Sequence, residues 1–237
     1  QFLPKNEVGL VDFNATIDWK NPTKAIFSGS HQIENTYLKL TPYPKAGSFL
    51  DGETGIQSSI AKTIDYILIK SKERSRQLDS IQRIVSPEFY QLESIRIKAD
   101  IINSFMSLPT YYSWVHKISK DSALIIQQQS DSLTRPIIAK LSKGLVDPIN
   151  LKLVVYRDIL KTILQNQPST FSIPQKINDW FKASAIKQKA ITLDNKNDLI
   201  ALNKGIDSIN SGVYKNAILS TIAQLTQLNQ GDPAIDI

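Results

Sequence analysis

The sequence predicts a mostly α-helical protein. We expect a multi-helix bundle or array of about six to eight helices, preceded by an extended, proline-rich N-terminal arm with short β segments. From about residue 54 onward, apolar residues recur at three- and four-residue spacing, which places them on one face of a helix. Before that point, apolar and polar residues alternate in short runs that prolines and glycines interrupt, as is typical of short strands.

Residues 1–50 are predicted to form the arm or a small β hairpin. Val11 and Phe13 flank Asp12, and the run YLKL at residues 37–40 alternates in the same way. Prolines within such a region keep its strands short or at the edge of a sheet. The arm could therefore pack against its own body or against a neighbouring subunit.

The first helix is predicted from isoleucines and leucines spaced along residues 56–68. The following run, KSKERSRQ at residues 70–77, is polar on every side, and apolar residues resume at Leu78. A helix that is polar all round cannot pack on a core. The sequence therefore leaves two alternatives for residues 70–77: a helix that projects into water, or a polar loop between two helices.

Ser86, Pro87 and Glu88 predict the start of the next helix. Serine can cap free backbone amides, proline suits the first helical position, and an acidic residue favours the positive helix end. Leu108 followed by Pro109 predicts the end of this helix, because the residue before a proline avoids helical geometry.

The remaining helix boundaries are predicted from similar signals. Pro136 is expected to break or kink its helix, and Gly144 is expected to follow the last residue of that helix. Later helix starts and the break between the last two helices are predicted at Asp147-Pro148, Ser172-Ile173-Pro174, Asp194 or Asp198, and Gly212. Along the chain we expect an arm at residues 1–50, a helical domain at residues 51–230 and a flexible tail at residues 231–237.

The chain is poor in chemically versatile side chains. It contains no cysteine, one methionine and two histidines, His31 and His116. It has no phosphate-binding loop, dinucleotide fingerprint or nucleophile elbow, and two histidines without cysteine cannot form an ordinary zinc site by themselves. We therefore predict no catalytic, cofactor-binding or metal-binding residue, and a protein that is not an enzyme. Carboxylate pairs that could still support catalysis are Asp51 with Glu53 and Asp65 with Asp100.

The chain is moderately basic, with a net charge of +6 and a pI of about 9.3, which favours acidic partners. The partner-binding candidates in its densest cationic run are Lys70, Lys72, Arg74 and Arg76. On a helix these cations would surround the rod rather than gather on one side, which favours a solvated or salt-bridged protein surface over nucleic acid or anionic lipid. A binding module for such polyanions would also use Lys182, Lys187 and Lys189.

An aromatic segment, PTYYSWVHK at residues 109–117, supplies a further candidate. Tyr111, Trp114 and Ile118 are expected to form a buried helical stripe. Tyr112 lies off that stripe, and we expect it to be the exposed aromatic residue available to a partner.

The sequence contains no apolar run of about 18 residues, so no transmembrane helix is predicted. It begins at Gln1 without a basic and apolar leader, and its lack of cysteine suits export. We expect an exported protein in a bacterial periplasm or at a cell surface, with a cytoplasmic location as the alternative.

These patterns favour a non-catalytic structural or protein-interaction subunit that forms homo- or hetero-oligomers, in a bacterial envelope, surface or secretion assembly. The first alternative is a basic helical module that binds nucleic acid or an anionic surface. The second is a secreted effector with unrecognised catalytic carboxylates. Removal of residues 1–50 would separate an arm-mediated assembly from polyanion binding.

Overall fold

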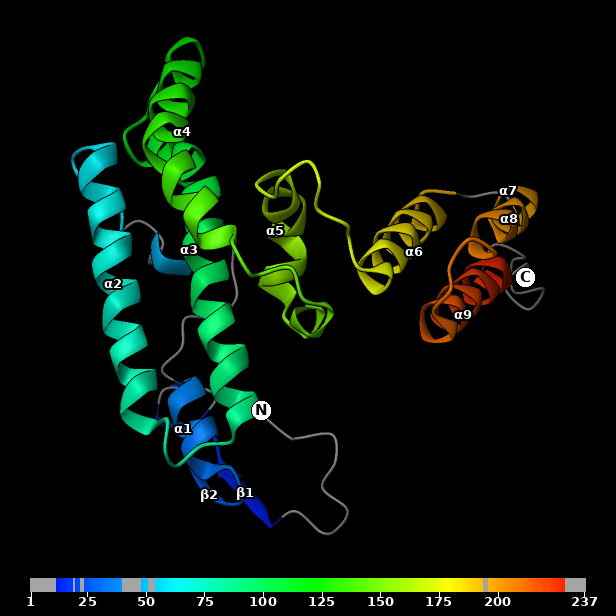
Figure 1. Cartoon of the computed structure of the whole chain (residues 1–237), viewed down its shortest axis with the longest axis horizontal. Helices are drawn as coiled ribbons and strands as arrows, with labels where there is room; N and C mark the ends of the chain where they lie inside the picture. Colours follow the sequence, from blue (N-terminus) through cyan, green and yellow to red (C-terminus); the bar gives the residue numbers. More distant parts are fainter. Residues whose placement is uncertain are drawn as a thin grey trace, which may run out of the picture. The chain divides into compact units, whose positions relative to one another are not determined.

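The computed structural model describes residues 12–18, 20–21, 24–39, 48–50, 54–193 and 196–228 (Figure 1). Within these residues the chain is mostly helical with one short two-stranded sheet, which confirms the predicted fold class. Part of the predicted arm, namely residues 1–11, 19, 22–23 and 40–47, lies outside the described residues, as does the predicted tail at residues 231–237.

Backbone contacts divide the chain into two compact units. Unit 1 comprises residues 1–145 and 149–167, and unit 2 comprises residues 146–148 and 168–237. The division falls within residues 51–230, for which the sequence pattern predicts one helical domain. The predicted boundary between arm and body at residue 50 stays a prediction.

Unit 1 contains the sheet and the longest helices (Figure 1). Its elements are β1 (Phe13–Thr16), β2 (Ile26–Gly29), α1 (Gln32–Lys39), η2 (Ser48–Leu50), α2 (Ile60–Ile81), α3 (Pro87–Val115), α4 (Lys120–Ser142) and α5 (Val154–Gln165). The 3-10 helix η3 (Pro148–Lys152) spans the point where the two units meet in sequence. Unit 2 contains α6 (Gln175–Ile191), α7 (Lys196–Ala201), α8 (Asn203–Ile206) and α9 (Gly212–Leu228).

The core of unit 1 is built around α3, which packs against α2, α4, α5 and η2. The residues that α3 buries lie on most sides of the helix, because it has several neighbours, whereas the sequence pattern predicts a single stripe. Fully buried members of unit 1 include Leu50, Ile67, Leu78, Phe89, Phe105, Leu108, Tyr156, Ile159, Leu160 and Ile163. Leu50 belongs to η2, so this short segment is anchored beneath the two long helices α2 and α3.

Serine residues begin the three long helices. In each case the serine hydroxyl accepts a hydrogen bond from a backbone amide three residues later, which satisfies one of the free donors at a helix N-terminus. The pairs are Ser59 with Lys62, Ser86 with Phe89, and Ser119 with Ser122. The helix start predicted at Ser86 is therefore confirmed.

The turn between α3 and α4 has a defined hydrogen-bond pattern. The amide of Ile118 donates to the carbonyl of Ser113 at 2.8 Å, and the amide of Lys117 donates to the carbonyl of Trp114 at 3.2 Å. Lys117 adopts a positive φ of 52° between these two bonds. This is the Schellman arrangement, which usually places glycine at the left-handed position. After α4 the residue in the left-handed conformation is a glycine, Gly144, with a φ of 73°, as predicted.

Two prolines do not end their helices. Pro109 lies inside α3, which continues to Val115, and Pro136 lies inside α4, which continues to Ser142. The predicted end at Pro109 was wrong, and α4 is not broken at Pro136. An internal proline costs a helix about 3 kcal/mol through its missing amide donor and ring clash. Packing of the apolar residues on both sides of Pro109 against α2 and α4 outweighs that local cost.

The N-terminal part combines a strand pair with a helix. β1 and β2 pair in an antiparallel register from Phe13 opposite Gly29 to Thr16 opposite Ile26. Residues 37–39, predicted as part of a strand, instead belong to α1. That prediction was wrong because the helix buries Tyr37 on one face against Phe89 of α3, whose ring centre lies 5.8 Å away. Tertiary packing therefore decides the local conformation.

Unit 2 packs α6 against α9, with α7 and α8 at their side. Its core contains Ala183, Ala190, Leu199, Leu202, Ile206, Ile209, Ile218 and Ile222. Asp179 of α6 accepts hydrogen bonds from the backbone amides of Asn210 at 3.1 Å and Ser211 at 2.9 Å. Burial opposes ionisation of Asp179, but these bonds and one from Gln175 outweigh it and hold the pKa of Asp179 below its usual value.

Candidate interaction surfaces

Arg74, predicted as a partner-binding residue, is buried between α2 and α1. Its Nη2 donates to the carbonyl oxygen of Tyr37 at 3.0 Å, and its Nη1 donates to Oε1 of Gln77 at 3.0 Å. The guanidinium carbon lies 3.6 Å from the centre of the Tyr37 ring, in a cation–π contact. Only 5% of Arg74 is exposed. Arg74 therefore holds the C-terminal turn of α1 against α2.

The polar run at residues 70–77 is part of the continuous helix α2. Both alternatives predicted for it were wrong, because Ser71 and Arg74 form a buried polar face against the rest of unit 1. Lys70 lies on the surface, where its Nζ is 3.2 Å from Oε2 of Glu73. Lys72 and Arg76 are exposed. The four candidate cations are thus divided between a buried contact and the surface of α2.

A buried ion cluster occupies the middle of α3. Nε of Arg96 lies 2.9 Å from both carboxylate oxygens of Glu93, and Nη1 of Arg96 contacts Asp100. All three side chains are buried. Burial alone would lower the pKa of Arg96, but the attraction of the Glu93 and Asp100 carboxylates outweighs it and raises that pKa. Arg96 is therefore held in its ionised form.

Tyr37 connects this cluster with Arg74. Burial raises the pKa of Tyr37 to about 12, although the positive charges of Arg74 and Arg96 oppose this effect. Arg74 and Arg96 supply two positive charges, and Glu93 and Asp100 supply two negative charges. We interpret this network as a structural connection between α1, α2 and α3.

The network also reaches η2. Ser104 donates through its hydroxyl to the carbonyl of Asp100 at 2.7 Å and accepts a bond from the amide of Phe49 at 2.9 Å. The spacing of Glu93, Arg96 and Asp100 places them on one helix face, a pattern that the sequence contains. Their burial depends on tertiary packing and could not be seen in the sequence.

The aromatic segment near the end of α3 is arranged differently from the prediction. The hydroxyl of Tyr112 donates to the carbonyl of Ser58 at 3.2 Å, and its half-buried ring packs against the core. Trp114 is 62% exposed, so its predicted burial was wrong. The partly buried stripe here runs through Tyr111, Tyr112 and Val115 instead, and Trp114 lies outside it.

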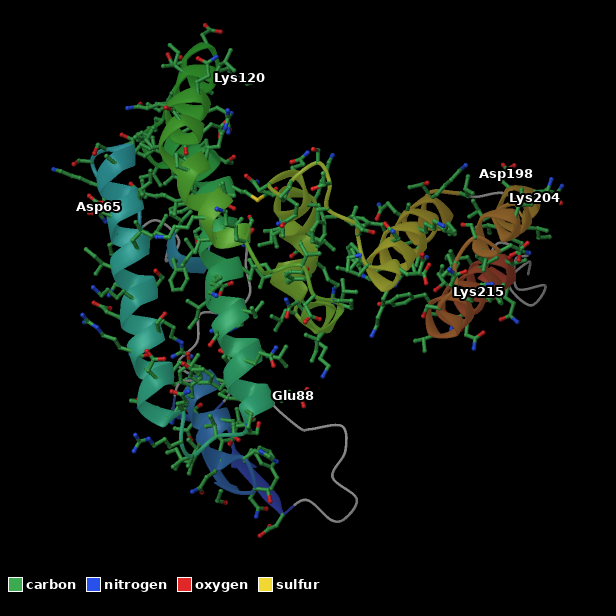
Figure 2. The ribbon with its side chains drawn as sticks, viewed as in Figure 1. Asp65, Glu88, Lys120, Asp198, Lys204 and Lys215 are labelled. Atoms are coloured by element: carbon green, nitrogen blue, oxygen red, sulfur yellow. The ribbon has the colours of Figure 1, made fainter. Side chains whose placement is uncertain are left out.

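The N-terminal half of α4 carries apolar residues on its outer side. Leu124 is 64% exposed and Ile125 is 63% exposed, while Ser130 and Thr134 face the core. Between residues 122 and 134 the chain has one charged residue, Asp131. We define the α4 surface as the exposed residues Leu124, Ile125, Gln128, Gln129, Ser132 and Leu133. Figure 2 shows Lys120 at the outer end of α4, just before this surface begins.

Sequence reasoning missed the α4 surface. Its apolar residues follow helical spacing closely enough to be interpreted as core. The usable signal was the lack of charge over residues 122–134 in a chain with 28 lysines and arginines. An exposed helix that carries so little charge is unusual for this composition, and charged residues are depleted in the cores of protein interfaces.

The residues considered for catalysis do not form a shared site in the described structure. Asp65 is exposed on α2, as Figure 2 shows, while Asp100 is buried and bound to Arg96. Asp51 and Glu53 lie outside the described residues. At the end of α3, Nε2 of His116 lies 2.9 Å from the carbonyl oxygen of Gln57, which precedes α2. His31 lies 3.3 Å from Glu34 in the first turn of α1.

No group of three histidine, cysteine or acidic side chains that could hold a metal ion occurs among the described residues. Over the same part of the chain, the helices are all too short or too polar to span a membrane. Lys182, Lys187 and Lys189, the further lysines predicted for polyanion binding, lie on α6 of unit 2. Nζ of Lys182 donates a hydrogen bond to the carbonyl of Ser208 at 2.8 Å.

The chain matches no protein-family model, and comparisons with curated proteins and with solved structures give no match either.

Proposed function

We propose that this protein is a non-catalytic subunit of a protein assembly and that it self-associates through the α4 surface. The observation that carries this proposal is the exposure of the adjacent residues Leu124 and Ile125, with Leu133 also exposed further along the same helix, in a stretch with little charge. Large apolar side chains that lie exposed close together are typical of interaction sites. Trp114, exposed near the end of α3, is an aromatic residue of the kind that contributes strongly to binding.

The energetics favour covering this surface. Removing one large aliphatic side chain from water contributes about 1.5–3 kcal/mol when its burial is complete. Leu124 and Ile125 are adjacent and both mostly exposed, so one partner surface can cover them together. Desolvation of the flanking glutamines and serines costs less than desolvation of lysines or glutamates, because no full charge has to be removed from water.

The charged residues of unit 1 support a non-catalytic role. Glu93, Arg96 and Asp100 bind one another in the core, and Arg74 binds α1. Their charge is used to connect helices and is held away from solvent. Export to a bacterial envelope remains a prediction of the sequence, as does the participation of residues 1–50 in assembly.

The proposal is tested by measuring the solution mass by light scattering at low and at high salt. We expect the wild-type protein to exceed its monomer mass of 26.6 kDa, and to do so at both salt concentrations because the contact is apolar. The variant Ile125→Glu should be monomeric. Its matched control is Ile69→Glu on α2, where the isoleucine is 57% exposed and the same charge is introduced.

Each alternative outcome has a definite meaning. A wild-type monomer at every protein concentration would contradict self-association. Equal effects of Ile125→Glu and Ile69→Glu would contradict the assignment of the contact to α4. A protein that copurifies with nucleic acid and releases it at high salt would instead favour the alternative of polyanion binding, because counterion release makes such binding strongly dependent on salt.

A further inference from the structure

A cavity of about 530 Å³ lies between β2, α1 and α2 in unit 1. Its apolar walls include Phe27, Ile33 and Ile81, and Tyr37 and Arg74 border it from inside unit 1. Ligand sites in proteins are typically clefts of about 300–1,000 Å³ with apolar walls and a few convergent polar groups. The cavity contains none of the residues of the α4 surface, so it is a separate feature.

Among the described residues that line this cavity, Arg74 is the only charged one. The face of its guanidinium is covered by the Tyr37 ring, and its Nη2 is bound to the Tyr37 carbonyl. These two contacts fix the guanidinium in position before any ligand arrives. A positioned cation at an apolar wall favours a ligand that carries one negative charge and an apolar body.

Gln77 indicates where the negative group would lie. Its Oε1 accepts a hydrogen bond from Nη1 of Arg74 at 3.0 Å, and Gln77 itself lines the cavity. Because Gln77 is exposed, its carboxamide can rotate into water at little cost. A ligand oxygen can then take the place of Oε1. Ionised acceptors bind arginine more strongly than a neutral amide does, so the exchange favours a carboxylate.

We propose that this cavity binds a small apolar carboxylate. The carboxylate replaces Oε1 of Gln77 at Nη1 of Arg74, and the apolar part lies along Phe27, Ile33 and Ile81. A carboxylate oxygen suits Nη1 of Arg74 because an ionised acceptor forms a stronger hydrogen bond with a guanidinium than the neutral Gln77 amide does. A phosphate group would bring more charge to this apolar lining than a carboxylate would.

The test uses decanoate as the probe and isothermal titration calorimetry as the measurement, with the full chain. The informative variant is Gln77→Glu, which places a competing carboxylate three residues from Arg74 on the same helix. This variant retains Arg74, so its fold is expected to persist, and a thermal melt checks this. The matched control is Gln224→Glu on α9, which makes the same chemical change on an exposed glutamine outside both the cavity and the α4 surface.

We expect decanoate to bind the wild type and the Gln224→Glu variant equally. Binding to the Gln77→Glu variant should be weaker by about tenfold or more, because the charged hydrogen bond is already occupied. Decan-1-ol, which has the same chain without the charge, should also bind the wild type about tenfold more weakly. The proposal is overturned if decanoate does not bind the wild type, if Gln77→Glu binds it as well as the wild type does, or if decan-1-ol binds as well as decanoate.

Discussion

Replacement of Arg96 by methionine is the sharpest test of how unit 1 is held together. Arg96 binds both oxygens of Glu93 through Nε at 2.9 Å and also contacts Asp100, which is only 1% exposed. Methionine preserves much of the side-chain volume but removes the cation. Two buried carboxylates then remain without the positive charge they share.

The expected loss follows from this geometry. Breaking a buried ion pair by removing one partner costs about 3–5 kcal/mol, because the remaining charge stays buried without compensation. The total stability of a domain is about 5–15 kcal/mol, so the loss is a large part of it. Replacing the whole cluster, as Glu93→Met, Arg96→Met and Asp100→Leu together, should return the stability to within about 1 kcal/mol of the wild type.

Hydrogen exchange in increasing urea is the suitable assay, because it reports the two units separately. Exchange of α3 amides measures the free energy of unfolding of unit 1, and exchange of α6 amides provides an internal reference from unit 2. The control Arg83→Met changes an exposed arginine and should alter stability by less than about 0.5 kcal/mol. A loss below about 1 kcal/mol in Arg96→Met, or a triple variant no more stable than the single one, would refute the reasoning.

Two further predictions concern the α3–α4 turn and unit 2. Lys117→Gly should stabilise unit 1 by about 0.5–1 kcal/mol in urea unfolding, because glycine adopts a positive φ without strain, whereas Lys143→Gly, at φ −63°, should not stabilise it. Asp179→Asn should lower the unfolding midpoint of unit 2 at pH 7, measured by exchange of α9 amides. The fold lowers the pKa of Asp179 below its ordinary value of 3.8. The stability that the carboxylate contributes is therefore fully present at a pH above 3.8 and is lost as the pH falls through the lowered pKa. Wild type and variant should accordingly become equally stable in acid. A stabilising Lys143→Gly, or an Asp179→Asn variant equal to the wild type at pH 7, would contradict these expectations.

Local signals in the sequence were sufficient for several boundaries. Ser86 was recognisable as a helix start because capping depends on the residue itself and on an amide three positions away. Gly144 was recognisable as a stop because a positive φ favours glycine almost regardless of surroundings. In both cases the deciding interaction involves residues that are close in sequence.

The candidate residues of the surfaces were harder to predict. Arg74 and Trp114 were assigned to the surface and to the core respectively, and the structure places each in the opposite environment. Periodicity shows which residues share a helix face, but it does not show how far the neighbouring helix extends along that face. α1 covers Arg74, whereas Trp114 is left 62% exposed near the end of α3.

The sequence by itself determined that this protein is mostly helical and has little of the side-chain inventory that common catalytic and metal sites need. Both follow from composition and from spacing within single helices. Only the tertiary structure decided that α3 continues through Pro109, that an ion cluster is buried beside Tyr37, and that α4 exposes Leu124 and Ile125. These features depend on contacts between segments far apart in the chain, whose packing energies outweigh local preferences and leave no mark in local spacing.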